Sequence, residues 1–186
     1  MLVIIMSNSI LLKIAKDAIE EELYDKSKID RVDLEANYDF LNDQRACFVT
    51  LKIDGRLRGC IGSLLPTRKL IDDVIVNAQN AAFRDFRFQP LSKKEFEKVE
   101  IEISLLTIPK MVIYDSVDEL REKIRPNIDG VILKQDQNRA TFLPQVWEEL
   151  PTFDEFFEHL SLKAGLDLDS LIHFPEISTY QVEKIK

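Results

Sequence analysis

A guanidinium and a thiol lie close together in Leu57-Arg58-Gly59-Cys60-Ile61-Gly62, the stretch whose residue types most suggest chemistry. A thiolate is a nucleophile, and a nearby guanidinium favours the thiolate over the thiol. Cys60 is therefore a candidate nucleophile, with Arg58 orienting an anionic group of the substrate. The alternative is that Cys60 is a small core residue, because free cysteine is among the most buried residue types.

The residues before this stretch predict a β-hairpin. The β-branched and aromatic run 47–53 precedes Asp54-Gly55, a dipeptide typical of the type I′ turn, in which both central residues need φ > 0. A two-residue loop pairs the strands as Ile53–Arg56, Leu51–Arg58 and Val49–Cys60. Since side chains alternate along a strand, Arg56, Arg58 and Cys60 would then share one face.

Two glycines and a second cysteine complete this predicted face. Gly59 and Gly62 would leave gaps where a ligand, a partner or another backbone segment can come close. The same register places Cys47 opposite Gly62 and diagonal to Cys60. Diagonal neighbours lie about 7–8 Å apart, at or beyond the limit of about 7 Å between Cα atoms for a disulfide. We therefore expect two free thiols.

Three more polar residues are candidates for the same site. A helix predicted to open at Pro66-Thr67 and to end near residues 80–83 carries Asn80 and is followed by Arg84. The run 99–105 alternates apolar and polar residues and predicts a strand with Glu102 on its polar side. That side faces either solvent or the arginines, and carboxylates on a half-exposed strand are more often simply solvated. His159 is a candidate base only if its helix packs beside the hairpin.

The net charge of −8 argues against non-specific binding to nucleic acid, but the charge is unevenly distributed. Residues 45–94 contain 10 Lys and Arg against 4 Asp and Glu, a local charge of +6, and the rest of the chain carries 15 against 29. A basic segment in an acidic protein suits an anionic ligand or an acidic partner. The alternative is that these cations only solvate one face.

The order of elements predicts an α+β fold with a mainly antiparallel sheet and flanking helices. Helices are expected from Ser9 to about Tyr24 and after three capping boxes, which begin at Ser92, Ser116 and Thr152. Strands arrive as hairpins or singly, at 131–134 with 140–143 and at 179–182 in addition to those above. A chain of 186 residues suits a single domain over 1–186, with two lobes allowed by its length.

Several classes of site are not indicated by the sequence. Two histidines and two cysteines, without Cys-x-x-Cys or His-Glu-x-x-His spacing, argue against a zinc or iron–sulfur site held by this chain alone. No Walker A or Gly-x-Gly-x-x-Gly sequence occurs. We therefore expect no cofactor. The apolar residues 1–6 are too few for a signal peptide or a membrane span, so we expect a cytoplasmic protein without a membrane partner.

The motif Leu-Arg-Gly-Cys-Ile-Gly, preceded by Phe-Val-Thr-Leu and Asp-Gly, resembles the signature of the AmmeMemoRadiSam system protein A family. That family shares its domain with the human protein of the Alport syndrome, midface hypoplasia and elliptocytosis region. The resemblance continues to Lys163-Ala164-Gly165-Leu166, through blocks at 81–85, 87–88, 99–104, 129–130, 141–147 and 159–161. It implies an α+β fold of two subdomains with the signature near the cleft between them, and it implies no particular reaction.

Two functions follow as hypotheses. The first is an accessory or ligand-recognition subunit that binds an anionic ligand or a partner at Arg58 and Cys60. The family name implies two companions, a Memo-like protein and a radical S-adenosylmethionine enzyme, to which redox chemistry would belong. The second is an enzyme that uses Cys60 as a nucleophile on a nucleotide- or RNA-linked substrate, which would imply a role in RNA metabolism.

Overall fold

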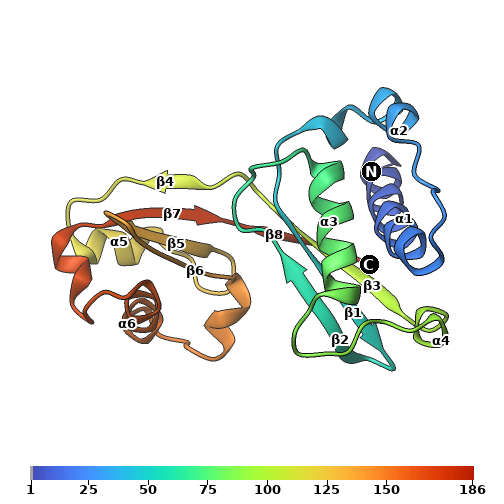
Figure 1. The fold of residues 1–186 in the computed structure, drawn as a ribbon. Coiled ribbons are helices and arrows are strands. Elements are labelled where there is room, and N and C mark those ends of the chain that lie inside the picture. The colour runs from blue at the N-terminus through green and yellow to red at the C-terminus, as the bar shows by residue number, and fades with distance from the viewer. Residues whose placement is uncertain (1) are drawn as a thin grey trace. The chain divides into compact units, whose positions relative to one another are not determined.

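The computed structural model describes the backbone of residues 2–186 and the side chains of residues 8–186. The chain forms two compact units, one of Met1–Leu106 with Glu183–Lys186 and one of Thr107–Val182. Each unit is built on its own four-stranded sheet and has its own helices (Figure 1). The ladders between strands are antiparallel, which confirms the predicted α+β class.

The sheet of the first unit has the order β2-β1-β3-β8, so β2 is an edge strand. Its strands are β1 (Cys47–Ile53), β2 (Arg56–Gly62), β3 (Glu100–Leu106) and β8 (Val182–Ile185). Two long helices, α1 (Leu2–Tyr24) and α3 (Leu70–Phe83), lie beside each other on one face of this sheet (Figure 1). The shorter elements are α2 (Arg31–Asn37), a 3-10 turn at Asp39–Asn42 and α4 (Lys93–Phe96).

The core of the first unit lies between the two long helices and the sheet. Leu11, Ile14 and Ile19 of α1 and Leu70, Ile71 and Val74 of α3 are almost fully buried there. Alternate residues of β1 face them, namely Cys47, Val49 and Leu51, each with 0 % exposed surface. The odd-numbered residues of β1 therefore define the inner face of the sheet, and its even-numbered residues define the outer face.

The second unit has the sheet order β4-β7-β5-β6. Its strands are β4 (Lys110–Val112), β5 (Gly130–Gln135), β6 (Asn138–Phe142) and β7 (Glu176–Tyr180). Helices α5 (Val117–Lys123) and α6 (Phe153–Ala164) and two 3-10 turns, Pro144–Glu148 and Ser170–His173, complete it. Its core contains Trp147 stacked on Phe156, with ring centroids 3.7 Å apart.

Local signals predicted several boundaries correctly. Asp54 and Gly55 form the predicted turn with φ of 52° and 74°, and reciprocal capping boxes open α4 at Ser92 and α6 at Thr152. At Ser116 only half of the predicted box forms, because Glu119 accepts from Asp115 N rather than from the capping residue. Gly165 ends α6 in a left-handed conformation, as expected of a C′ glycine.

Other boundaries differ from the sequence predictions. Helix α1 begins at Leu2 rather than at Ser9, and α3 begins at Leu70, four residues after Pro66. Helix α2, which is capped by the side chain of Asp30, is not among the elements that the sequence predicts. The single strand predicted at 179–182 is replaced by the end of β7 and the start of β8, which belong to different sheets.

Candidate functional site

The first hairpin contains a β-bulge that changes which residues share a face. Ile53 pairs with Arg56 as predicted, but the register shifts after Lys52, so that Gly59 pairs with Leu51 and Cys60 with Thr50. Arg58 is the extra residue of the bulge. The prediction that Arg56, Arg58 and Cys60 share a face is therefore wrong, because a one-residue shift moves the later side chains to the opposite face.

Cys60 lies on the outer face of the sheet, away from the core. Its sulfur accepts a hydrogen bond from the Thr50 hydroxyl, with 3.3 Å between Oγ1 and Sγ, and the side chain is partly exposed. Glu102 pairs with Thr50 on its other side, so Cys60, Thr50 and Glu102 form one row across three strands. Cys60 is therefore not the core residue beside Val49 that the predicted register allowed.

Arg58 is held by α4 and by the loop that precedes it. Its Nε donates to Glu95 Oε1 at 2.8 Å, and its Nη2 donates to the carbonyl of Gln89 at 2.8 Å. The same carboxylate accepts from Ser92 in the capping box of α4. The Arg58 hydrogen bond lowers the pKa of Glu95 to about 2. Because Arg58 forms an ion pair with Glu95, it links α4 to the edge strand and does not present an open site for an anion.

The backbone of Cys60 is clamped by two residues of the loop after α3. Asp85 Oδ2 accepts the Cys60 N–H at 2.9 Å, and Arg87 Nη2 donates to the Cys60 carbonyl at 3.1 Å. Arg87 also donates through Nε and Nη2 to the two oxygens of Asp85, at 2.9 and 2.7 Å. We call these two residues the Asp85–Arg87 clamp. It satisfies the polar groups that an edge strand otherwise leaves unpaired.

The clamp is nearly buried at its centre. The side chain of Asp85 is only 1 % exposed, and the hydrogen bonds from Arg87 hold the pKa of this carboxyl well below its usual range. Phe88 lies between two cations, with its ring centroid 5.7 Å from the Arg58 guanidinium carbon and 5.6 Å from that of Arg87. The clamp and Arg58 thus form one connected assembly around Phe88.

Both glycines of the signature are in close contact with other residues rather than beside a gap. A Cβ on Gly59 would lie 2.1 Å from the Ala81 carbonyl oxygen of α3, so only glycine lets the helix approach β2 this closely. At Gly62 an added Cβ would overlap the ring of Phe48. The space that was predicted to admit a ligand is filled by the protein at both positions.

The remaining predicted residues form contacts of their own, and of these residues Glu102 shares the outer face of the sheet with Cys60. Arg84 forms an ion pair with Glu22 of α1, at 2.8 Å between Nη2 and Oε1. Glu102 pairs with Lys52 and Lys186, at 2.9 and 3.1 Å. Asn80 lies in α3 without a side-chain hydrogen bond among the described residues. His159 is an exposed residue of α6 in the second unit, where its Nδ1 lies 2.9 Å from the Glu155 carbonyl oxygen.

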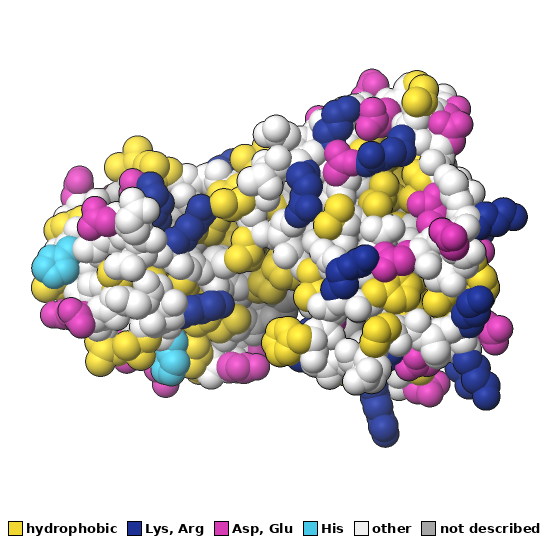
Figure 2. All heavy atoms as spheres, in the orientation of Figure 1, with side chains coloured by type: hydrophobic (Ala, Val, Ile, Leu, Met, Phe, Trp, Pro, Cys, Tyr) yellow, Lys and Arg dark blue, Asp and Glu magenta, His cyan; other side chains and the backbone are white. Residues whose placement is uncertain are grey.

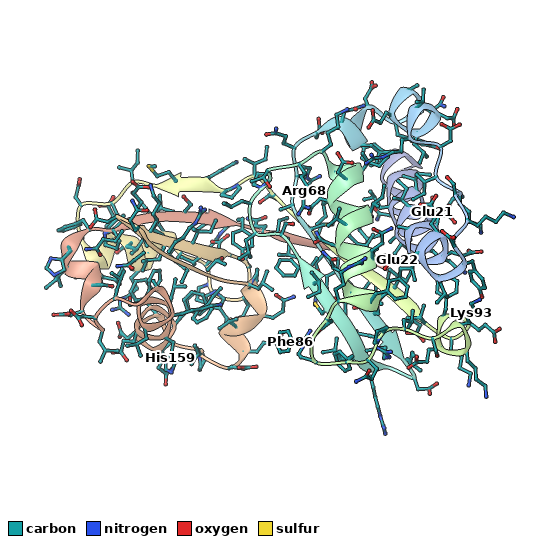
Figure 3. The ribbon with its side chains drawn as sticks, in the orientation of Figure 1. Glu21, Glu22, Arg68, Phe86, Lys93 and His159 are labelled. Carbon is teal, nitrogen blue, oxygen red and sulfur yellow. The ribbon has the colours of Figure 1, made fainter. Side chains whose placement is uncertain are left out.

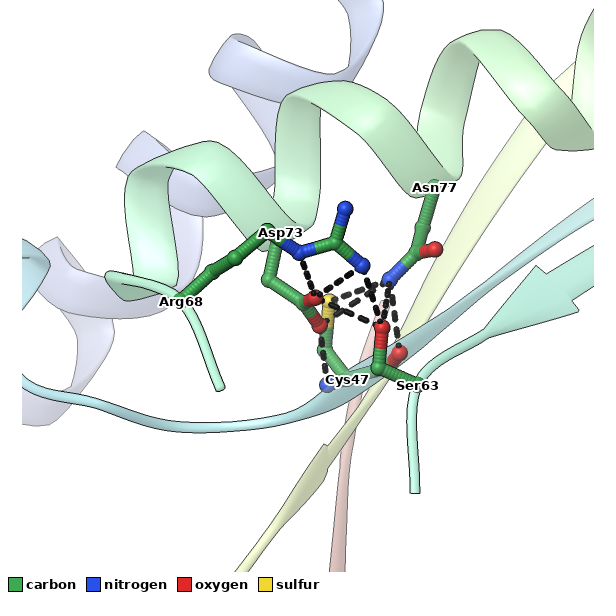
Figure 4. Close-up of polar contacts among 5 residues, drawn as sticks. All are labelled: Cys47, Ser63, Arg68, Asp73 and Asn77. Carbon is green, nitrogen blue, oxygen red and sulfur yellow. Dashed lines mark hydrogen bonds and ion pairs between the residues drawn. The ribbon is translucent and has the colours of Figure 1, made fainter. Parts of the chain in front are cut away.

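A second polar cluster joins the start of β1 to α3 (Figure 4). Asp73, 1 % exposed, accepts hydrogen bonds from Cys47 N, Asn77 Nδ2, Ser63 Oγ and Arg68 Nε, at 2.6 to 3.1 Å. Burial raises the pKa of the Cys47 thiol well above its usual range. Since each polar group around Asp73 has a partner, this cluster braces the segment between β2 and α3.

The cysteines are free, as predicted, but for a different reason. The bulge and the end of the hairpin place Phe48, not Cys47, opposite Gly62. Cys47 therefore lies on the inner face and Cys60 on the outer face. The sheet itself separates the two thiols.

Most cations of the basic segment 45–94 are matched by acidic partners. The pairs include Lys52–Glu102, Arg58–Glu95, Arg68–Asp73, Lys69–Glu35, Arg84–Glu22 and Arg87–Asp85. Basic and acidic side chains are accordingly interleaved over the first unit (Figure 2). Acidic residues from outside the segment thus reduce the local positive potential that the sequence suggested.

The residues that hold the signature strand in place, Asp85, Arg87 and Glu95, are not among the site residues that the sequence predicts. Asp85 and Arg87 fall within blocks that carry the family resemblance, and Glu95 belongs to the capping box that begins at Ser92. The signal for Glu95 was available, because a capping-box carboxylate has a second oxygen with which to accept from an arginine. Nothing local in the sequence indicates that Asp85 reaches Cys60, 25 positions earlier.

Among the described residues, no group of three or more His, Cys, Asp or Glu side chains is arranged to hold a metal ion. Within the same part of the chain, no helix combines the length and apolar character needed to cross a bilayer.

Comparisons with known proteins give a consistent result. A Methanothermobacter thermautotrophicus protein is 36% identical over 174 residues, which cover 93% of this chain and 89% of that protein. A Methanocaldococcus jannaschii protein is 36% identical over 158 residues, covering 83% of this chain and 77% of its own length. The crystal structure of an uncharacterised protein from Pyrococcus horikoshii matches with a TM-score of 0.76 and 30% identity, covering 94% of this chain and 88% of that one.

The sequence profile of the AMMECR1 family matches residues 12–185. This match covers both units and the signature strand, and it confirms the resemblance inferred from the motifs. The chain therefore belongs to the AMMECR1 family.

Proposed function

We propose that this chain is a recognition subunit that binds a partner protein through the turn Asp85–Phe88, with Phe86 as its anchor. The observation that carries this proposal is the exposure of Phe86, which is 94 %. Figure 3 labels Phe86 on the loop between α3 and α4. Large apolar side chains are mostly buried, and aromatic residues are enriched at protein interfaces.

Two hydrogen bonds order the backbone of the turn that carries Phe86. The Phe88 N–H donates to the Asp85 carbonyl at 3.0 Å, and the Arg87 N–H donates to Asp85 Oδ1 at 3.2 Å. The Asp85–Arg87 clamp ties this turn to the edge strand. A side chain on a backbone that is already ordered loses less conformational entropy on binding, which favours affinity.

The expected partner is a protein with an apolar pocket that fits a phenyl ring. The family resemblance implies a Memo-like protein and a radical S-adenosylmethionine enzyme as the first candidates. In this proposal the signature motif serves recognition indirectly, because Cys60 supplies the backbone groups that the clamp holds. The anionic ligand expected at Arg58 is not part of the proposal, since Glu95 already matches that charge.

The test is a binding measurement between the purified chain and each candidate partner. Phe86→Ala should weaken binding at least about tenfold. A buried aromatic anchor in a typical interface contributes about 2 kcal/mol or more, which corresponds to a change in affinity of about thirtyfold. Val32→Ala is the matched control, since Val32 on α2 is an exposed apolar residue at 82 %. Equal binding by both variants, or no binding of either partner to the unmodified chain, contradicts the proposal.

A second candidate function is favoured by the surroundings of the Cys60 sulfur. The Cys60 side chain is partly exposed on the outer face of the sheet, and the Thr50 hydroxyl donates to its Sγ at 3.3 Å. Under this alternative, Cys60 attacks an electrophilic centre of a nucleotide- or RNA-linked substrate. Cys60→Ser should then abolish turnover and leave partner binding unchanged, whereas Phe86→Ala should do the reverse. If a maleimide fails to label Cys60 in the folded protein, the nucleophile hypothesis is wrong.

A further inference from the structure

We infer that the second unit contains a binding site for a phosphate group, in a cavity lined by Thr107, Lys110, Arg125, Asp129, Thr179 and Gln181. The cavity has a volume of about 180 Å³. It lies where β4 begins and β7 ends, beside the segment that follows α5. This site is separate from the Phe86 turn, and the inference does not depend on the proposed function.

The walls of the cavity are ordered by their own hydrogen bonds. Thr107 N donates to the Gln181 carbonyl at 2.9 Å, and Gln181 N donates to Thr107 Oγ1 at 2.9 Å. Arg125 donates to Asp129 from its backbone N, its Nε and its Nη2, at 3.0, 2.9 and 2.7 Å. A ligand would therefore meet groups that are already positioned.

Several hydrogen-bond donors are left available in the cavity. Thr107 Oγ1 already accepts from Gln181 N, which leaves its proton free to donate to a ligand. Arg125 uses Nε and Nη2 for Asp129 and leaves Nη1 for another acceptor. Among the residues that the structure describes, neither the ammonium of Lys110 nor the hydroxyl of Thr179 has a protein partner.

The acidic group that lines the cavity is already used. Both carboxylate oxygens of Asp129 accept from Arg125, and Asp129 is 2 % exposed. Because Arg125 and Asp129 form an ion pair, the ammonium of Lys110 is the charged group of the lining that has no partner among the described residues. A ligand that offers several acceptor oxygens and a negative charge fits this inventory, and a phosphate group has both.

The size of the cavity restricts the ligand. Cavities for drug-sized molecules measure about 300–1,000 Å³, so this one suits a single phosphate group, either free or at the end of a larger molecule. Inorganic phosphate and glycerol 3-phosphate distinguish these two sources. Tighter binding of the ester identifies an esterified phosphate, and tighter binding of inorganic phosphate identifies the free anion.

The test is isothermal titration of the full chain with inorganic phosphate at low ionic strength. Lys110→Gln should weaken binding about tenfold, because hydrogen bonds to charged groups are the strong ones. Thr179→Val, which keeps the side-chain shape, should weaken binding about threefold. Lys134→Gln is the charge-matched control at the opposite end of β5, where Lys134 pairs with Glu176, and it should bind as the unmodified chain does.

Two results overturn the inference. One is an equal loss in Lys110→Gln and Lys134→Gln, which means non-specific attraction of an anion to surface charge. The other is a failure of the unmodified chain to bind phosphate at tens of millimolar. Circular dichroism on each variant separates loss of the site from loss of the fold, and Thr179→Val keeps the test valid if Lys110→Gln is unstable.

Discussion

The carboxylate of Asp85 accepts the backbone N–H of Cys60, with 2.9 Å between Oδ2 and N. This contact joins the loop after α3 to the edge strand that carries the family signature. Arg87 Nη2 also donates a hydrogen bond to the Cys60 carbonyl oxygen, so the peptide groups on both sides of Cys60 are held by hydrogen bonds. The signature strand, the loop and the exposed phenyl ring of Phe86 therefore act as one structural unit.

Asp85→Asn should lower the free energy of unfolding by about 2–3 kcal/mol, because the Asp85 carboxylate is only 1 % exposed and would lose its charge-assisted hydrogen bonds with Arg87. An asparagine oxygen still accepts from Cys60 N but cannot accept both Arg87 hydrogen bonds. Urea unfolding at neutral pH measures the change. Asp167→Asn, at an exposed position, is the control and should change the stability by less than about 0.5 kcal/mol. Equal stability of the two variants would mean that the clamp contributes nothing.

Stability should fall in acid as Glu95 takes up a proton. Its pKa is lowered to about 2 in the folded chain by Arg58, from an ordinary value of 4.5. A carboxyl with a lowered folded pKa stabilises the fold above its unfolded pKa, and this contribution is lost as pH falls from about 4.5 to about 2. The Glu95 side chain is 37 % exposed, so we expect a loss of only about 1 kcal/mol.

Glu95→Gln isolates this contribution. The variant should show a smaller stability difference between pH 6 and pH 3 than the unmodified chain, in urea unfolding at both values. Glu149→Gln, at an exposed position, should keep the full difference. An unchanged pH dependence in Glu95→Gln would show that Arg58 does not hold this carboxylate in solution.

The two thiols should react at very different rates in the folded protein. Cys60 is partly exposed, whereas Cys47 is fully buried and its pKa is raised by burial. Iodoacetamide followed by mass spectrometry should modify Cys60 first and Cys47 only after unfolding. Cys60→Ser should then leave the native protein almost unlabelled. Equal labelling of the two residues would contradict the outward position of Cys60.

Gly59→Ala should destabilise the first unit by about 2–4 kcal/mol, because its Cβ would overlap the Ala81 carbonyl oxygen and push α3 away from β2. Gly55→Ala provides the comparison, since Gly55 has a positive φ but open space around it. There we expect only about 1 kcal/mol, the cost of the backbone conformation. Thermal unfolding of both variants measures the difference. A smaller loss at Gly59 than at Gly55 would contradict the close packing of α3.

Interactions between neighbouring residues could be predicted from the sequence. The Asp54-Gly55 turn, the Ser92 and Thr152 capping boxes and the Gly165 helix end depend on contacts within about four residues, so the local residue types suffice. The alternating pattern around Ile101 and Ile103 likewise predicted a strand. The motifs along the chain were enough to recognise the family.

The position of each candidate side chain was decided by tertiary structure. Next to the bulge at Arg58, Gly59 packs against Ala81 and the Cys60 N–H donates to Asp85, and both partners lie more than 20 positions away in the sequence. A shift of one residue moves a side chain to the other face of a sheet, and no local pattern encodes it. The sequence by itself therefore determined which residues form the hairpin, and contacts between distant segments determined that Cys60 and Arg58 are separated while Phe86 is exposed.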